Sequence, residues 1–295
     1  LSRDDPVEAA DVANATASSL ATVVADVEST EGQPSPVRLT TVEQALVPTS
    51  AVSPRPAVNI ALAAFVALII AIGIAVLRTV LDTRIRSSRD VASVTTEPML
   101  GSIAFDPKSK QRPLIVEAEP LNPRAEAYRT LRTNLQFVEV DGKGRTFVMT
   151  SSLPGEGKST TSANLAISLV DAGETVLLID ADLRKPKTAE YLGIEGRIGL
   201  TDVLIGRAKV VDAVQEWGGK GLYVLPAGRI PPNPSELLGS KTMVALLQNL
   251  EAEFDWIIID APPLLPVTDA AVLATHAAGA IVSVAAGRTT QHQLT

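Results

Sequence analysis

The sequence predicts a doubly wound α/β domain with a mostly parallel sheet, preceded by a transmembrane helix and a partial extracytoplasmic helical segment. Two observations support this prediction. From Thr146 onward, apolar strand-like segments alternate with helical segments, which is typical of βαβ units and a parallel sheet. Upstream, residues 60–77 are eighteen consecutive uncharged residues, close to the roughly 20 that cross a bilayer.

The composition excludes several kinds of site. The 295 residues contain no cysteine and only two histidines, which excludes disulfides and thiolate metal sites and leaves little material for a histidine cluster. The net charge of -7 is concentrated in residues 1–56, which hold three basic and eight acidic side chains. Because no basic block with interleaved aromatic residues occurs, we expect no nucleic acid partner.

We interpret residues 57–77 as a single transmembrane helix. A buried core helix is the alternative, but such a helix seldom lacks every charge over this length. One arginine occurs in the twenty residues before the span and four follow closely, so the positive-inside rule places the C-terminal side in the cytoplasm. The membrane crossed would be the inner or plasma membrane of the cell. The arginines are Arg55 before the span and Arg78, Arg84, Arg86 and Arg89 after it.

The span divides the chain into an extracytoplasmic and a cytoplasmic part. Residues 1–56 form the outer segment, in which 5–29 have helical spacing, 39–47 resemble a short strand and 48–57 an extended connector. Because the chain starts within an expected helix without Met and stops after a strand, we expect truncation at both ends and a missing first span.

The cytoplasmic part begins with a juxtamembrane linker at 78–119, in which a short strand is expected at 100–105, followed by the α/β domain at 120–295. A helix is predicted at its start, with Asn122 as N-cap and Pro123 in the first position. Apolar residues of this helix share one face, whereas a second face is charged and could be only a solvated surface with one ion pair. The apolar residues are Tyr128, Leu131 and Leu135, and the charged ones are Glu126, Arg129 and Arg132.

Five strands and three further helices are expected in the domain, with a ligand site at the C-terminal ends of the strands. The expected strands are 146–150, 175–183, 221–228, 256–260 and 280–284. The expected helices are 160–173, 235–253 and 268–277.

The loop "SSLPGEGKSTT" at 151–161 joins the first of these strands to a helix, where backbone N-H groups and the helix N-terminus can face an anion. Glycines allow close approach to phosphate, Lys158 adds a charge, and the Ser159 hydroxyl can bind Mg²⁺. The G-x-x-x-x-G-K-[ST] pattern is met except that Ser152 replaces its first glycine. The predicted nucleotide contacts are Ser152, Pro154, Gly155, Glu156, Gly157, Lys158, Ser159 and Thr160.

Two later segments end buried strands with carboxylates. Asp180 and Asp182 lie in "LLIDADLRKP", and Asp260 ends "WIIID". Unpaired buried carboxylates are costly, so a cation such as nucleotide-bound Mg²⁺ is expected beside them, with Ser159, Asp182 and Asp260 as its ligands. A turn in which Asp caps a helix is the alternative. Either Asp180 or Asp182 could accept the proton of an attacking hydroxyl. With the loop, these segments form the arrangement of P-loop NTPases.

The three motifs resemble the Walker A, A′ and B motifs of the bacterial tyrosine autokinases, or BY-kinases, and "PPNPSELL" at 231–238 also resembles that family. The span with its flanks resembles the chain-length determinant half of polysaccharide co-polymerases. This resemblance implies a membrane-anchored, ATP- and Mg²⁺-dependent protein-tyrosine kinase that autophosphorylates and regulates the polymerisation, chain length and export of extracellular or capsular polysaccharide. Its partners would be the polymerase and export machinery and a tyrosine phosphatase.

The resemblance also assigns roles to individual residues. Lys158 becomes the phosphate-binding lysine, and Asp180 and Asp182 the catalytic carboxylates. The charged face Glu126, Arg129 and Arg132 matches the family motif E-x-x-R-x-x-R, which docks subunits into a homo-oligomeric ring. The family's acceptor tyrosines lie in a C-terminal cluster, whereas this chain has only Tyr128, Tyr191 and Tyr223.

Two alternatives remain. The first is a ParA/MinD-like ATPase switch without kinase activity, against which Leu153 counts because those ATPases carry a lysine there. The second is a structural co-polymerase that binds ATP and only supports a ring.

Overall fold

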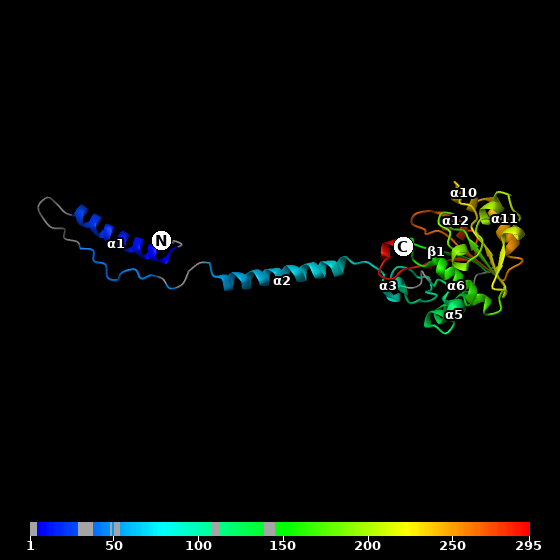
Figure 1. Ribbon diagram of the computed structural model, residues 1–295, viewed down its shortest axis with the longest axis horizontal. Coiled ribbons are helices and arrows are strands. Elements are labelled where there is room, and N and C mark those ends of the chain that lie inside the picture. Colours follow the sequence, from blue (N-terminus) through cyan, green and yellow to red (C-terminus); the bar gives the residue numbers. More distant parts are fainter. Residues whose placement is uncertain (1–4, 29–37, 48, 50–53, 108–111, 139–144) are drawn as a thin grey trace. The chain divides into compact units, whose positions relative to one another are not determined.

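The computed structural model describes residues 5–28, 38–47, 49, 54–107, 112–138 and 145–295. The chain divides into two compact units, Leu1–Asp82 and Thr83–Thr295, which are blue to cyan and cyan to red in Figure 1.

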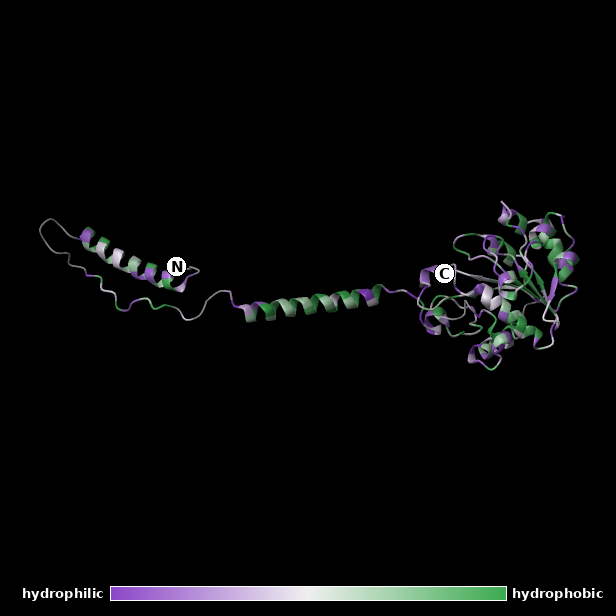
Figure 2. Ribbon diagram, in the orientation of Figure 1, coloured by the Kyte–Doolittle hydropathy of each residue, from purple (hydrophilic) through white to green (hydrophobic). Residues whose placement is uncertain are grey.

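The described residues of the first unit form two helices. Helix α1, Pro6–Glu28, confirms the helix expected near the start of the chain. Helix α2, Pro56–Leu81, has a mean hydropathy of 3.1 over its most apolar window, and none of its residues is buried. Between its polar ends, α2 is mostly hydrophobic in Figure 2, and it is long and apolar enough to cross a membrane. It continues past the expected end at residue 77 because nothing in "RTVL" breaks a helix.

The short strand expected at 39–47 is wrong, because these residues are irregular and exposed. The backbone of Ala45 is bound by a side chain of α1 instead: Ala45 N donates to Asn14 Oδ1 over 2.7 Å, and Asn14 Nδ2 donates to Ala45 O over 3.2 Å. No strand among the described residues pairs with this segment. Half of the expected connector, residues 48 and 50–53, lies outside the described residues, and its last two residues belong to α2.

The second unit is built on a six-stranded sheet in the order β3-β4-β2-β5-β1-β6. All neighbouring strands are parallel except β3, which pairs antiparallel with β4 at one edge. The five expected strands are confirmed, whereas β3 was not predicted. The strands are β1 Thr146–Ser151, β2 Val176–Asp180, β3 Gln215–Trp217, β4 Leu222–Leu225, β5 Trp256–Asp260 and β6 Gly279–Ser283.

Helices cover both faces of this sheet, which confirms the doubly wound architecture (Figure 1). Consecutive strand residues point to opposite faces, so Val148 packs in one core cluster and its neighbours Phe147 and Met149 in the other. Helices α4, α5 and α6 contribute to the cluster of Phe147, and α8, α10, α11 and α12 to that of Val148. These helices are α4 Ile115–Ala118, α5 Pro123–Gln136, α6 Lys158–Val170, α8 Leu200–Leu204, α10 Pro234–Leu238, α11 Lys241–Leu250 and α12 Asp269–Ala274.

The described part of this unit contains four more short helices, which, like α4 and α8, were not predicted. They contain four or five residues each, too few for a helical period to stand out in a sequence. They are α3 Ser88–Ala92, α7 Thr188–Leu192, α9 Val210–Ala213 and α13 Gln291–Leu294.

The start of the domain follows the prediction at α5 but not before it. Asn122 caps α5 by accepting a hydrogen bond from Arg124 N over 2.9 Å, as expected from the Asn-Pro pair. The strand expected at 100–105 is wrong: the segment is irregular, and Leu100 O accepts a hydrogen bond from Asn134 Nδ2 over 2.7 Å. Leu100 and Ile103 pack on the core as isolated anchors, which explains their apolar character without a strand.

Candidate functional site

The sheet order brings the three predicted motifs together at the C-terminal ends of the strands. Strand β5 lies between β1 and β2, and Asp260 is in register with Met149 on one side and Asp180 on the other. Because neighbouring parallel strands have their C-terminal ends on the same side of the sheet, the glycine-rich loop after β1 and the carboxylates that end β2 and β5 become neighbours. Segments more than 100 residues apart in the sequence therefore form one site.

The loop after β1 has the backbone that its glycines predict. Gly155 and Gly157 have φ angles of +79° and +88°, a region that other residues rarely adopt. Gly157 precedes α6, and no side chain caps the first turn of that helix. The free N-H groups of this turn and the positive end of the helix dipole favour an anion at this position.

The Lys158 side chain lies within the carboxylates rather than in solvent. Its Nζ is 2.8 Å from Asp182 Oδ2 and 3.7 Å from Asp260 Oδ1, and it donates to Ser159 Oγ over 3.2 Å. All four side chains are buried or nearly so. Burial acts to lower the pKa of Lys158, but the charges of Asp260 and Asp182 outweigh it and raise that pKa above its ordinary value.

Asp260 has an unused acceptor. Its Oδ1 accepts from Ser162 Oγ over 3.2 Å, whereas its Oδ2 is buried and has no hydrogen-bond partner in the described part of the chain. Burial raises the pKa of Asp260, although Lys158 opposes this shift. A buried carboxylate oxygen without a donor fits a cation or a cation-bound water. The residues present therefore fit Mg²⁺ near Ser159 and Asp260.

Asp180 and Asp182 have different partners. Asp180 Oδ2 accepts from the backbone N-H groups of Lys187 and Thr188 over 3.1 and 3.0 Å, so Asp180 holds the start of α7. Burial, followed by the charge of Asp260, raises the pKa of Asp180 to about 7. Asp182 instead accepts from Lys158 and, over 3.0 Å, from Lys185 N. Asp180 thus has a helix-capping role beside its predicted catalytic one.

The Glu156 side chain binds protein groups. Its carboxylate accepts hydrogen bonds from Leu153 N over 2.7 Å, from Ala285 N over 3.3 Å and from the Thr289 hydroxyl. Arg288 NH1 donates to Gly155 O over 3.0 Å. The loop is therefore fastened to residues beyond β6, and Glu156 could reach a nucleotide only through its backbone.

The same C-terminal segment pairs with the chain that follows α2. Ile85 N donates to Thr289 O over 2.9 Å, and Gly287 N donates to Ile85 O over 2.7 Å. Ile85 is 3% exposed, so this short antiparallel contact is anchored by an apolar side chain. Within the second unit, residues 83–86 are thus connected through 287–291 to the nucleotide loop.

A contact network that sequence reasoning missed lies beside Asp182. Arg184 pairs with Asp269 at the start of α12, with 2.9 Å between Nε and Oδ2. Ser235, in "PPNPSELL", hydrogen-bonds to both residues. The motif itself was visible in the sequence, but the partners are 34 to 85 residues apart and no local pattern joins them.

The predicted oligomer residues lie on α5, which packs on α6. Arg129 is paired with Glu126 over 2.9 Å, and both are partly or largely exposed. Arg132 NH1 donates to Ser168 O of α6 over 2.9 Å, so this arginine also joins two helices of its own subunit. Arg129 NH2 also donates to Pro120 O over 2.8 Å, so both arginines are partly used within the subunit and Glu126 is largely exposed.

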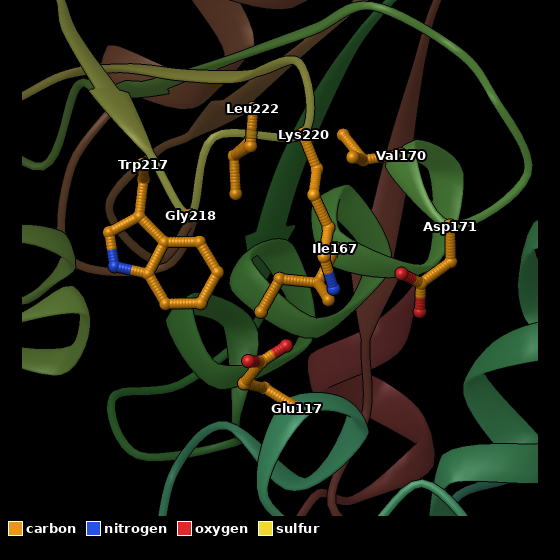
Figure 3. Close-up of a pocket in the computed structure, with 8 residues that line it drawn as sticks. All are labelled: Glu117, Ile167, Val170, Asp171, Trp217, Gly218, Lys220 and Leu222. Atoms are coloured by element: carbon orange, nitrogen blue, oxygen red, sulfur yellow. The ribbon is translucent and has the colours of Figure 1, made fainter.

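A separate pocket lies at the opposite ends of the strands, where α6 ends and β4 begins (Figure 3). In Figure 3, the side chain of Lys220 extends toward Ile167, with Trp217 at one side, Asp171 at the other and Glu117 below. None of the residues that line this pocket belongs to the three motifs. It is distinct from the nucleotide site.

Comparison with known proteins agrees with this geometry. The family model described as an AAA domain matches residues 144–291. The chain is 45% identical over 183 residues to the tyrosine-protein kinase YwqD of Bacillus subtilis, covering 62% of this chain and 77% of that protein. The chain belongs to the bacterial tyrosine-kinase family.

Other members match as well. The putative tyrosine-protein kinase EpsB of Ralstonia nicotianae is 35% identical over 247 residues, covering 80% of this chain and 33% of that protein. The solved kinase domain of the Escherichia coli tyrosine kinase ETK is 28% identical with a TM-score of 0.65, covering 70% of this chain and 84% of that chain. The chain thus spans about three quarters of the Bacillus kinase and one third of the Ralstonia one.

The raised pKa of Asp180 predicts a pH-dependent stability. Between about pH 4 and 7, folded Asp180 keeps a proton that the unfolded chain, with a pKa near 3.9, has lost. The free energy of unfolding should therefore fall as the pH rises through this window, and Asp180→Asn should reduce that fall. Urea unfolding of the full chain in micelles, followed by the fluorescence of Trp217 and Trp256, measures it.

The exposed Asp212→Asn serves as the control, because it leaves the site untouched and should keep the wild-type pH dependence. An Asp180→Asn curve parallel to that of the wild type from pH 4 to 7 would contradict the assignment.

Proposed function

We propose that this chain transfers the γ-phosphate of ATP to protein tyrosine and, as a membrane-anchored kinase, regulates the polymerisation, chain length and export of an extracellular polysaccharide. The observation that carries this proposal is the position of Lys158, whose Nζ lies between Asp182 and Asp260 at the C-terminal ends of the neighbouring strands β1, β5 and β2. Membership of the tyrosine-kinase family supports the reaction type. The long apolar helix α2 and its resemblance to co-polymerase spans support the cellular process.

The contact between Lys158 and Asp182 suggests how a nucleotide would bind at this site. Phosphate oxygens would compete with Asp182 for Lys158, while N-H groups of the loop and of the first turn of α6 bind the phosphates. Mg²⁺ would neutralise charge that develops on the transferred phosphoryl group. The release of Asp182 from Lys158 would leave its carboxylate free to orient the metal-bound nucleotide or the acceptor hydroxyl, with Ser159 and Asp260 beside it.

The acceptor would come from another subunit or protein. Tyr128 is 2% exposed and lies in the core, and Tyr223 packs edge-on against Phe254, so neither is presented to an active site. The third tyrosine, Tyr191, is fixed within the short helix α7 and is partly buried. We therefore propose transfer between chains in a homo-oligomeric ring, with a tyrosine phosphatase reversing it. The polysaccharide polymerase and export machinery would contact the extracytoplasmic residues 1–56.

The kinase reaction is tested by incubating the full chain with Mg²⁺ and ATP, with and without an added tyrosine peptide, and probing for phosphotyrosine. Lys158→Met should reduce the signal on the order of 100-fold or more, because it removes the cation that stabilises phosphoryl charge. Lys241→Met, an exposed lysine at the start of α11, is the matched control and should retain activity.

Three results would separate the alternatives. Absence of phosphotyrosine from the wild type, or equal signals from the wild type and Lys158→Met, would remove the kinase proposal. ATP hydrolysis without phosphotyrosine would favour a ParA/MinD-like switch. Nucleotide binding with neither reaction would favour a structural co-polymerase.

The ring is tested on the exposed face of α5. Glu126→Ala and Arg129→Ala should each lower the mass measured by light scattering, because they remove charged side chains from this face. Arg129→Ala also removes the bond to Pro120 O and should lower stability. Arg132→Ala should also weaken assembly, but it removes the bond to Ser168 O and should lower stability as well. The control is Arg197→Ala, which breaks an exposed ion pair with Glu195 away from α5. An unchanged mass for Arg129→Ala and Glu126→Ala would exclude this face from the interface.

A further inference from the structure

Ser235 belongs to "PPNPSELL", a motif to which the proposed reaction gives no role, and it completes a three-residue network with Arg184 and Asp269. The Ser235 hydroxyl donates to Asp269 Oδ1 over 2.5 Å and accepts from Arg184 NH2 over 3.1 Å. Arg184 Nε donates to Asp269 Oδ2 over 2.9 Å, and its NH2 lies 3.4 Å from Asp269 Oδ1. Each of the three side chains is thus bonded to the other two.

The three side chains of this network differ in burial, and the buried carboxylate fixes the more exposed arginine. Asp269 is 0% exposed, whereas the Arg184 side chain is 39% exposed. A fully buried carboxylate is costly unless it is paired and hydrogen-bonded, and the planar guanidinium can satisfy both of its oxygens. Asp269 and Ser235 therefore hold the Arg184 guanidinium in one orientation through three hydrogen bonds.

The network joins the segments that follow three neighbouring strands. Arg184 follows β2, Ser235 follows β4, and Asp269 follows β5, and these strands are adjacent in the sheet. Arg184 lies between Asp182 and Lys185, whose backbone N-H donates to Asp182 Oδ1. A shift of Arg184 would therefore move the peptide that orients the Asp182 carboxylate against Lys158.

We propose that Asp269 and Ser235 are positioning residues for phosphoryl transfer, which act through Arg184 on the orientation of Asp182. This inference rests on the proposed kinase function. Among the described residues, the glycine-rich loop and the first turn of α6 make no hydrogen bond or ion pair to these three residues, so ATP should still bind when the network is broken. The transfer step, which needs Asp182 in place, should slow.

The expected result is a loss in kcat without a matching loss in nucleotide binding. Asp269→Asn should lower kcat for a tyrosine peptide by about tenfold or more, since small misplacements at a reacting centre can cost on the order of 100-fold. Ser235→Ala should lower kcat less, and Ser235→Thr, which keeps the hydroxyl, should restore most of it. The dissociation constant of a fluorescent ATP analogue should change by less than about threefold in all three, because the loop contacts remain.

A purely structural role would give a different pattern. Ser240→Ala is the matched control: Ser240 caps α11 by accepting from Met243 N over 3.2 Å, in the helix after α10, and does not contact Arg184. This variant should lower the urea midpoint but leave kcat unchanged. If Ser235→Ala behaves like Ser240→Ala, with a lower midpoint and a normal kcat, the inference is wrong.

The failure of the inference can be told apart from the failure of the proposed function. An active wild type with a normal kcat in folded Asp269→Asn and Ser235→Ala overturns only the positioning role. Equal losses in kcat and in nucleotide binding overturn it too. If Asp269→Asn does not fold, Ser235→Ala and Ser235→Thr decide the question. An inactive wild type would remove both proposals.

Discussion

The candidate site depends on the pairing of one buried ammonium group with carboxylates from two other strands. Lys158 begins α6, and its Nζ contacts Asp182 after β2 and lies near Asp260 at the end of β5. Removing one partner of such a buried pair typically costs about 3–5 kcal/mol, because it leaves an uncompensated charge. The sheet order is what makes the pairing possible, since β5 lies between the strands that carry the loop and the second motif.

The same interaction suggests how the proposed reaction would begin. In this structure the lysine compensates the charge of the buried carboxylates. In the proposed reaction, a nucleotide would bring phosphates for the lysine and a divalent cation for the carboxylates, so the charges would exchange partners without either being left alone. Around this centre, Glu156 fastens the loop to residues 285–289, and Arg184 fastens the segment after β2 to α10 and α12.

The elements that could be predicted from the sequence are those determined by residues close to one another in the chain. Strand β5 ends at Asp260 as expected, and Asn122 caps α5, because an apolar run and an Asn-Pro pair act over a few residues. The strand expected at 39–47 failed because a strand needs a partner, and Asn14 occupies the backbone of Ala45 instead. The bonds of Glu156 to Thr289 and of Arg184 to Asp269 span 133 and 85 residues, and no local pattern encodes them.

The most direct test of this exchange of charge partners is a structure of the full chain bound to Mg²⁺ and a non-hydrolysable ATP analogue. The account predicts that Lys158 Nζ moves from Asp182 Oδ2 to a β- or γ-phosphate oxygen, while Asp260 faces the metal or one of its waters. A nucleotide-bound structure in which Lys158 still contacts Asp182 over the present 2.8 Å would contradict it.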